Sequence, residues 1–77
     1  MKKITSRTDR TKLKQGTYLS DGSEYATYYL LVSDYNGDYY KAKVYMVDFD
    51  GYIVFTHEVV ELTESDLIGM YIVGEDL

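Results

Sequence analysis

Two short turn signals divide the middle of the chain into segments with the composition of β-strands. Asn-Gly stands at 36–37 and Asp-Gly at 50–51. Both dipeptides favour tight hairpin turns, because Gly adopts positive φ without steric cost. The surrounding residues are rich in Val, Ile, Thr and Phe, with ten tyrosines in a chain of 77 residues, and these side chains suit a pleated sheet. The pattern predicts a short strand over 17–20, then an antiparallel meander of strands over 25–33, 38–48 and 52–60.

The alternation of side chains within 38–48 predicts which face of the sheet is buried. The even positions from Tyr40 to Met46 are apolar, whereas the odd positions include Lys41 and Lys43, so the even positions are expected to face the core. A three-residue loop over 35–37, with its Gly in the left-handed conformation, keeps the inner face apolar by setting Leu30 opposite Ala42. We therefore expect this loop in the first hairpin.

For the second hairpin, a two-residue loop over 50–51 gives the more consistent pairing. It sets Met46 opposite Phe55 on the inner face. On the outer face it sets Lys43 opposite Glu58, an opposite-charge pair that contributes roughly 0.2–1 kcal/mol. This hairpin is therefore expected to have a shorter loop than the first.

After residue 62 the chain carries signals for a helical turn and then a strand. Residues 63–66 supply side-chain oxygens that cap a helix and acids that favour its positive end. Gly69 argues against a long helix, and residues 70–73 have strand composition. In element order the chain resembles an SH3-like barrel, which implies an all-β fold whose meander closes into a small barrel, with one helical turn before the last strand. The alternative is an α+β fold, in which 64–72 forms a longer helix packed across the meander.

Charge is distributed unevenly along the chain. Residues 1–14 hold six basic residues and one acid, whereas the rest holds twelve acids and two lysines, and the net charge is −5. The stretch 5–11 has no apolar periodicity. The sequence therefore predicts a basic, flexible leader over 1–14 and a single acidic β domain over 15–77. Removal of residues 1–6 is expected to leave the thermal stability nearly unchanged.

The residue types that carry most enzyme chemistry are scarce. The chain has no Cys, no Trp and one His, and it lacks a Gly-rich phosphate loop. The lone His57, predicted opposite Val44, is expected to be a core or rim residue. The pair Asp48 and Asp50 has ordinary turn chemistry, and a calcium loop counted from Asp48 has Val59 where a bidentate Glu is required. We expect a non-enzymatic protein with no catalytic residues, no metal site and no cofactor.

Tyrosines and acids at the strand ends stand out as candidate binding residues. Tyr is enriched at interfaces because it offers a large rigid contact area with a polar tip. The chosen registers place five tyrosines on the outer face of the sheet: Tyr25, Tyr29, Tyr39, Tyr45 and Tyr52. The predicted partner-binding residues are Tyr29, Asp34, Tyr35, Asp38, Tyr39, Tyr45, Asp48, Asp50 and Tyr52.

These residues are expected to form an acidic, tyrosine-rich surface that acts on a protein partner. The expected function is that of an inhibitor or adaptor that blocks the basic groove of a nucleic-acid-handling protein, as a mimic of nucleic acid. In size and charge the chain resembles the small acidic inhibitors that phages and mobile elements encode against host defence or repair enzymes.

Two other functions stay open from the sequence. A nucleic-acid-binding barrel would use Tyr39, Lys41, Lys43 and Tyr45 together with the basic leader. A structural subunit would associate with itself through exposed strand edges, as a homodimer for example.

The sequence also bears on where the protein is found. Its longest apolar run, 67–73, is too short to span a bilayer, so no membrane partner is expected. No apolar stretch follows Lys2 and Lys3 as a secretory leader requires, so a cytoplasmic location is expected.

Overall fold

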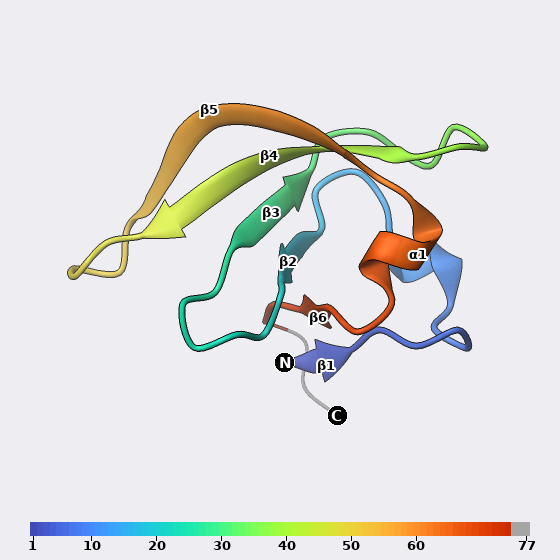
Figure 1. The fold of residues 1–77 in the computed structure, drawn as a ribbon, viewed down its shortest axis with the longest axis horizontal. Helices are drawn as coiled ribbons and strands as arrows, with labels where there is room; N and C mark the ends of the chain where they lie inside the picture. The colour runs from blue at the N-terminus through green and yellow to red at the C-terminus, as the bar shows by residue number, and fades with distance from the viewer. Residues whose placement is uncertain (75–77) are drawn as a thin grey trace.

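The computed structural model describes residues 1–74, which form one curled, six-stranded antiparallel sheet with a short helix (Figure 1). A 3₁₀ turn, η1 (Arg10–Lys12), precedes the second strand, and the helix α1 (Glu64–Leu67) precedes the last. The strands are β1 (Lys2–Lys3), β2 (Tyr18–Ser20), β3 (Tyr28–Leu31), β4 (Tyr40–Val47), β5 (Ile53–Leu62) and β6 (Tyr71–Ile72). The predicted all-β meander with a helical turn before its last strand is confirmed.

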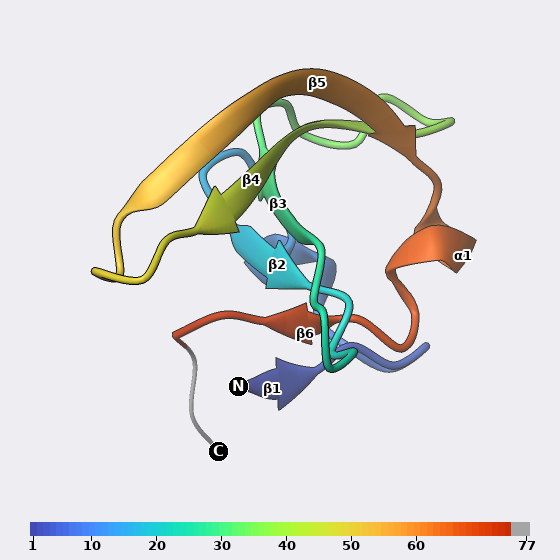
Figure 2. The same cartoon turned by 60° about the vertical axis from the view of Figure 1, so that its left-hand side comes forward.

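The sheet is open and does not close into a barrel. Its strand order is β1-β6-β2-β3-β4-β5, so β1 and β5 form the two edges, and they do not pair with each other in the part of the chain that the structure describes (Figure 2). The alternative of a long helix over 64–72 is not formed, because α1 ends at Leu67 and Gly69 follows with a φ of 94°. A capping box fixes the start of α1: the Thr63 hydroxyl accepts the Asp66 N–H at 3.2 Å, and the Asp66 carboxylate accepts the Thr63 N–H at 2.8 Å.

One face of the sheet carries the main core. Neighbouring strands supply fully buried side chains to it, such as Leu19 in β2 and Leu31 in β3. Side chains from outside the strands cover this face, among them Leu13 and Leu67. The cluster consists of Ile4, Leu13, Leu19, Leu31, Tyr40, Ala42, Leu62, Leu67 and Ile72.

The basic N-terminal segment is packed into this core. β1 pairs with β6, the Ile4 N–H donates to the Met70 carbonyl at 2.7 Å, and the Ile4 carbonyl accepts the Gly69 N–H at 2.9 Å. Ile4 is only 2% exposed, and Leu13 is also buried. These two apolar residues hold both ends of the polar stretch between them. The segment predicted as a basic leader over 1–14 thus contributes one strand and two buried apolar side chains to the fold.

The opposite face of the sheet is partly covered by an aromatic cluster around Tyr45, which is only 3% exposed. Its ring stacks on Tyr28 with centroids 5.2 Å apart, and it meets Tyr18 and Phe55 edge-on at 5.6 and 6.0 Å. Burial raises the pKa of Tyr45 to about 12. The face that was expected to be solvent-exposed therefore buries its central tyrosine.

The predicted register of the first hairpin is wrong by one residue. Leu31 lies opposite Ala42, so Leu31 and not Leu30 faces the core. The connection between β3 and β4 is longer than three residues, since β3 ends at Leu31 and β4 begins at Tyr40. Side chains supply hydrogen bonds within it: Asn36 Oδ1 accepts the N–H groups of residues 38 and 39 at 2.9 Å each, and Ser33 Oγ accepts the Lys41 N–H at 3.0 Å. The positive φ expected within this loop is present, at 102° for residue 37.

The second hairpin has a three-residue loop and not the predicted two. Asp48 N–H donates to the Tyr52 carbonyl and Gly51 N–H donates to the Asp48 carbonyl, both at 3.0 Å, and Gly51 has a φ of 86°. This is a type I turn closed by a left-handed glycine. Met46 consequently lies opposite Val54 and not opposite Phe55.

A bulge in β5 shifts the pairing once more along the same hairpin. Residues 56–58 of β5 lie against Val44 alone, and His57 takes a φ of 70°. The Thr56 hydroxyl donates to the Val44 carbonyl at 3.2 Å and accepts the Glu58 N–H at 3.4 Å, which replaces part of the interrupted ladder. The predicted pairing of Lys43 with Glu58 is therefore absent, and His57 is exposed on the bulge instead of facing the core.

Candidate protein-binding surface

The predicted partner-binding residues are divided among three places. One group lies in the β3–β4 loop (Asp34, Tyr35, Asp38 and Tyr39), one lies at the β4–β5 turn (Asp48, Asp50 and Tyr52), and Tyr29 and Tyr45 lie in the sheet. In Figure 1 the β3–β4 loop and the β4–β5 turn are at opposite ends of the molecule, whose longest dimension is 35 Å. The nine residues do not form one continuous surface.

The two predicted tyrosines within the sheet lie on opposite faces, and both are at least half-buried. Tyr45 is the centre of the aromatic cluster, and Tyr29 is half-buried against the main core. Burial raises the pKa of Tyr29. The exposed outer face with five tyrosines that the sequence predicts is absent: Tyr45 lies on that face but is buried, and the register shift turns Tyr29 to the core face.

The polar groups of the β3–β4 loop hold the loop itself together. Asp34 Oδ1 accepts the Gln15 N–H at 2.8 Å, and the Tyr35 hydroxyl donates to the Gly37 carbonyl at 2.9 Å. The Tyr35 ring packs on Tyr40 with centroids 5.1 Å apart. Asp38 is exposed, but Asp34 and Tyr35 have structural roles in this loop.

The β4–β5 turn and the strand ends that flank it carry the most exposed apolar surface. We call residues 46–55 the hairpin end. Phe49 at its turn is fully exposed and Tyr52 is 70% exposed. The exposed large apolar residues of the hairpin end are Met46, Val47, Phe49, Tyr52, Ile53, Val54 and Phe55.

The apolar side chains of the hairpin end lie on both faces of the sheet. Val47 and Ile53 pair on one face, whereas Met46 and Val54 pair on the other. The core cluster does not reach either pair, so the hairpin end projects from the body at the left of Figure 1. At roughly 200 Å² for each large aromatic side chain, Phe49 and Tyr52 alone present on the order of 300 Å², the size of a typical functional patch.

The turn that carries Phe49 is held in one conformation. Asp48 Oδ1 accepts the Asp50 N–H at 3.0 Å and the Tyr52 N–H at 2.8 Å. In this turn Phe49 stands between Asp48 and Asp50, and the Asp48 carboxylate accepts the hydrogen bonds that hold the turn. A turn whose backbone is already fixed loses less entropy on binding than a flexible loop does.

The bulge restricts how a partner can use the edge of β5. Strand addition needs a regular row of backbone groups, and the left-handed His57 interrupts that row in the middle of β5. A partner would therefore contact the side chains of the hairpin end, with at most the short segment Ile53–Phe55 available for backbone pairing.

The acids and Tyr52 of this region were predicted from the sequence as partner-binding residues, whereas Phe49, Ile53 and Val54 were not. A signal for them exists: Ile53, Val54 and Phe55 are consecutive, so they place apolar side chains on both faces of one strand. Such a run indicates either a strand buried on both faces or an exposed binding element, and only the structure distinguishes the two.

Two further findings concern other kinds of site. Among residues 1–74, no three His, Asp or Glu side chains gather closely enough to hold a metal ion. The helices of that same range include none with the length and apolar character needed to cross a bilayer.

Comparison with protein-family models, with curated proteins and with solved structures finds no match to this chain.

Proposed function

We propose that the protein is a non-enzymatic binding protein that inserts its hairpin end into a cleft on a partner protein. The observation that carries the proposal is the apolar surface of residues 46–55, which is open on both faces of a projecting hairpin. Exposed apolar patches of this kind mark interaction sites. Burial of Phe49 and Tyr52 would supply most of the affinity, because aromatic side chains near the centre of an interface dominate its energy.

The charge of the chain defines the partner further. The net charge is −5, and Asp48 and Asp50 flank the apolar turn. The complementary cleft has apolar walls and a rim of Lys and Arg side chains. A groove of that character is found on proteins that handle nucleic acid, and a hairpin wedged into it would exclude the nucleic acid. We therefore propose inhibition by occlusion, in the cytoplasm where such proteins act.

Nucleic acid itself fits the exposed surface less well. The stacking face expected for it depended on Tyr45, whose ring is enclosed by its aromatic neighbours. Lys41 and Lys43 are exposed, but the Lys43 ammonium lies 5.9 Å from the centroid of the Phe55 ring.

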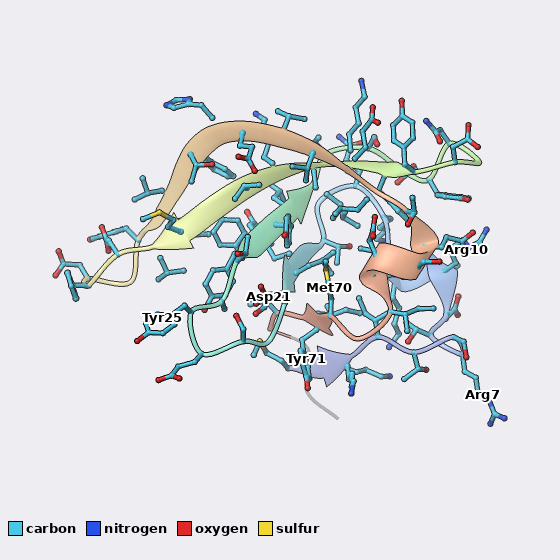
Figure 3. The ribbon with its side chains drawn as sticks, in the orientation of Figure 1. Arg7, Arg10, Asp21, Tyr25, Met70 and Tyr71 are labelled. Carbon is cyan, nitrogen blue, oxygen red and sulfur yellow. The ribbon has the colours of Figure 1, made fainter. Side chains whose placement is uncertain are left out.

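The test begins by identifying the partner. The tagged protein carries a photo-crosslinking phenylalanine analogue in place of Phe49 and is used to capture proteins from a lysate of the cell that encodes it. The control carries the same analogue in place of Tyr25, which is 89% exposed and points away from the sheet in the β2–β3 connection (Figure 3). A partner crosslinked at position 49 and not at 25 supports the proposal.

The affinity of the purified partner is then measured for variants. Phe49→Ala combined with Tyr52→Ala is expected to weaken binding at least about tenfold, whereas Tyr25→Ala leaves it unchanged. Asp50→Lys is also expected to weaken binding to the partner. This substitution is preferred to one at Asp48, because the Asp48 carboxylate holds the turn. Equal affinity of the double variant and the wild type would exclude the hairpin end as the docking surface. Recovery of nucleic acid alone, or of a second copy alone, would replace the proposal by one of the two alternatives.

A further inference from the structure

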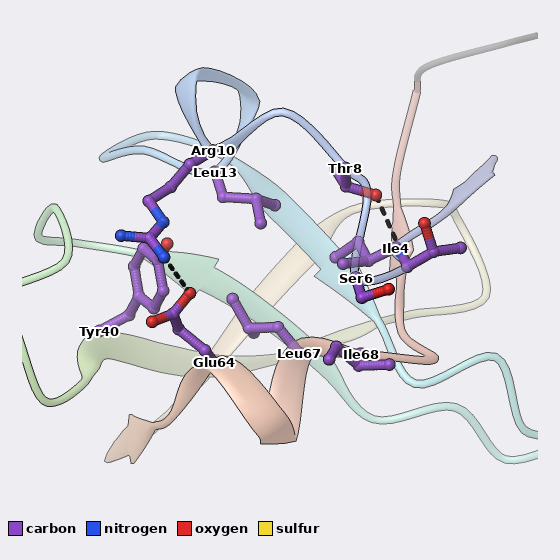
Figure 4. A pocket seen from close by; sticks show the side chains of 10 residues that line it. Ile4, Ser6, Thr8, Arg10, Leu13, Tyr40, Glu64, Leu67 and Ile68 are labelled. Carbon is purple, nitrogen blue, oxygen red and sulfur yellow. Dashed lines mark hydrogen bonds and ion pairs between the residues drawn. The ribbon is translucent and has the colours of Figure 1, made fainter.

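A second cluster of interacting side chains lies at the other end of the molecule, where η1 meets the β3–β4 loop and α1. The guanidinium carbon of Arg10 lies 5.1 Å from the centroid of the Tyr35 ring. Arg10 Nη2 also donates to Glu64 Oε2 in an ion pair. Figure 4 shows Arg10 facing Glu64, with Tyr40 beside them. An aromatic face and a carboxylate thus contact the same planar cation.

The walls of this cluster are fixed by contacts that do not involve Arg10. Tyr40 is part of the main core, and the Tyr35 ring packs against it. The Tyr35 hydroxyl is held by the Gly37 carbonyl. Glu64 follows Thr63, whose capping box fixes the first turn of α1. Removal of the Arg10 side chain should therefore leave the cation site in place.

Arg10 itself is held weakly. Its side chain is 60% exposed and that of Glu64 is 46% exposed. Ion pairs and cation–π contacts at such exposed positions contribute roughly 0–1 kcal/mol each, so a competing guanidinium can replace Arg10.

A pocket of about 230 Å³ adjoins the cluster and shares Arg10, Tyr40 and Glu64 with it (Figure 4). Its remaining walls include the apolar side chains of Leu13, Leu67 and other residues. The stem of an arginine side chain is aliphatic, so it can lie along apolar surface while its head meets a carboxylate. The pocket provides room for such a stem beside Glu64.

We infer that Tyr35, Tyr40 and Glu64 form a binding site for an arginine side chain of a partner protein, and that Arg10 fills this site in the free protein. The planar guanidinium suits the site better than an ammonium does, because it stacks on an aromatic face while it donates to a carboxylate. The site is separate from the hairpin end and does not depend on the function proposed for it. Since Arg10 competes from within the same chain, it lowers the apparent affinity for an external arginine.

The inference is tested with a short peptide that contains one arginine and has blocked ends. The control peptide contains citrulline, which has the same shape but no charge. Binding is followed by nuclear magnetic resonance at the ring signals of Tyr35 and Tyr40, in the wild type and in Arg10→Ala. We expect the arginine peptide to bind Arg10→Ala at least about fivefold more tightly than the wild type, which corresponds to the loss of one such contact.

Three comparisons complete the experiment. The citrulline peptide is expected to bind at least about fivefold more weakly than the arginine peptide, and adding Glu64→Gln to Arg10→Ala should reduce arginine binding by a similar factor. Phe49→Ala with Tyr52→Ala should leave arginine binding unchanged, which separates this site from the hairpin end. Arg10→Met keeps the apolar stem and takes the place of Arg10→Ala if the latter folds poorly. Equal binding of the two peptides, or equal binding by wild type and variant, would overturn the inference.

Discussion

The two halves of the β4–β5 hairpin have similar apolar sequences but different surroundings. At its root, Tyr40 and Leu62 pair with each other and both are buried. At its end, Val47 and Ile53 pair in the same way, yet each is 45% exposed. The N-terminal segment and α1 contribute side chains that cover the root, whereas the core cluster does not extend to the end. Apolar strand composition therefore does not by itself indicate a core.

The difference in burial between the root and the end of the β4–β5 hairpin assigns them different roles: the root stabilises the fold, and the end is available for binding. Side chains at the root lose their solvent contact when the chain folds, so they contribute to the free energy of unfolding. Side chains at the hairpin end keep about 40% or more of their solvent contact, so this remaining apolar surface becomes buried only when a partner binds.

The largest expected effect tests this separation directly. Leu31→Ala should lower the free energy of unfolding by about 2–5 kcal/mol, because Leu31 is fully buried beside Ala42. Ile53→Ala at the hairpin end should lower it by less than about 1 kcal/mol. Urea denaturation followed by circular dichroism measures both. Similar losses for the two variants would mean that the hairpin end is part of the core.

An alkaline titration sharpens the comparison at the boundary between the halves, where Tyr45 lies. The unfolded chain ionises near the ordinary pKa of 10.0, whereas folded Tyr45 keeps its proton to about 12. Between these values the unfolded state binds fewer protons, so stability is complete below pH 10 and falls as the pH rises toward 12, by at most about 2–3 kcal/mol. Tyr45→Phe should remove most of that fall, while Tyr52→Phe at the exposed end should not change it. A wild-type stability that is constant from pH 9 to 12 would contradict the burial of Tyr45.

Two glycines with similar backbone conformations provide a third test. Gly22 has a φ of 76° and Gly51 a φ of 86°. A Cβ added at Gly22 would lie 2.4 Å from the Tyr71 ring, whereas a Cβ added at Gly51 would have no neighbouring atom within 4 Å. Gly51→Ala should cost about 1 kcal/mol of stability through positive φ alone, and Gly22→Ala more than about 2 kcal/mol, because the ring must also move. If thermal denaturation gave equal losses, the Tyr71 ring would be free to move aside.

The smallest expected effect concerns the bulge that separates the halves. Thr56→Val keeps the shape of the side chain but removes the hydroxyl that bonds to Val44 and Glu58, so stability should fall by about 0.5–1.5 kcal/mol. Thr56→Ser retains the hydroxyl, so it should lower the stability by less than Thr56→Val does. Urea denaturation of the two variants measures the difference. A larger loss for Ser than for Val would show that the methyl group, and not the hydroxyl, stabilises the bulge.

The order and type of the central elements could be predicted because local signals agree there. The glycines at 37 and 51 have the positive φ expected of them, and Thr63 caps the helical turn. Strand registers could not be predicted in the same way. They depend on hydrogen bonds that the side chains of Asn36 and Ser33 accept and on the bulge at Thr56, which hydrophobic alternation does not encode.

The candidate surface was predicted only in part. The exposed acid Asp50 and Tyr52 were named because turns are exposed wherever they occur. Tyr29 was misplaced on the outer face, because a shift of one residue exchanges the two faces of a strand. Tyr45 does lie on the outer face, but its aromatic neighbours bury it. The buried role of Ile4 was missed, since a single apolar residue within a basic segment has no periodicity to reveal it.

The pairing of β1 with β6 has a consequence for the order in which the protein folds and opens. Lys2 lies opposite Ile72, so this contact joins nearly the whole length of the chain, whereas β3, β4 and β5 join through short loops. Loop-closure entropy delays distant contacts, so β1 should dock last during folding and detach first during native-state fluctuations. In hydrogen exchange, the amides of residues 2–4 should then exchange faster than those at the centre of β4. Each such opening would uncover the edge of β6, including Ile72, while β6 stays paired with β2.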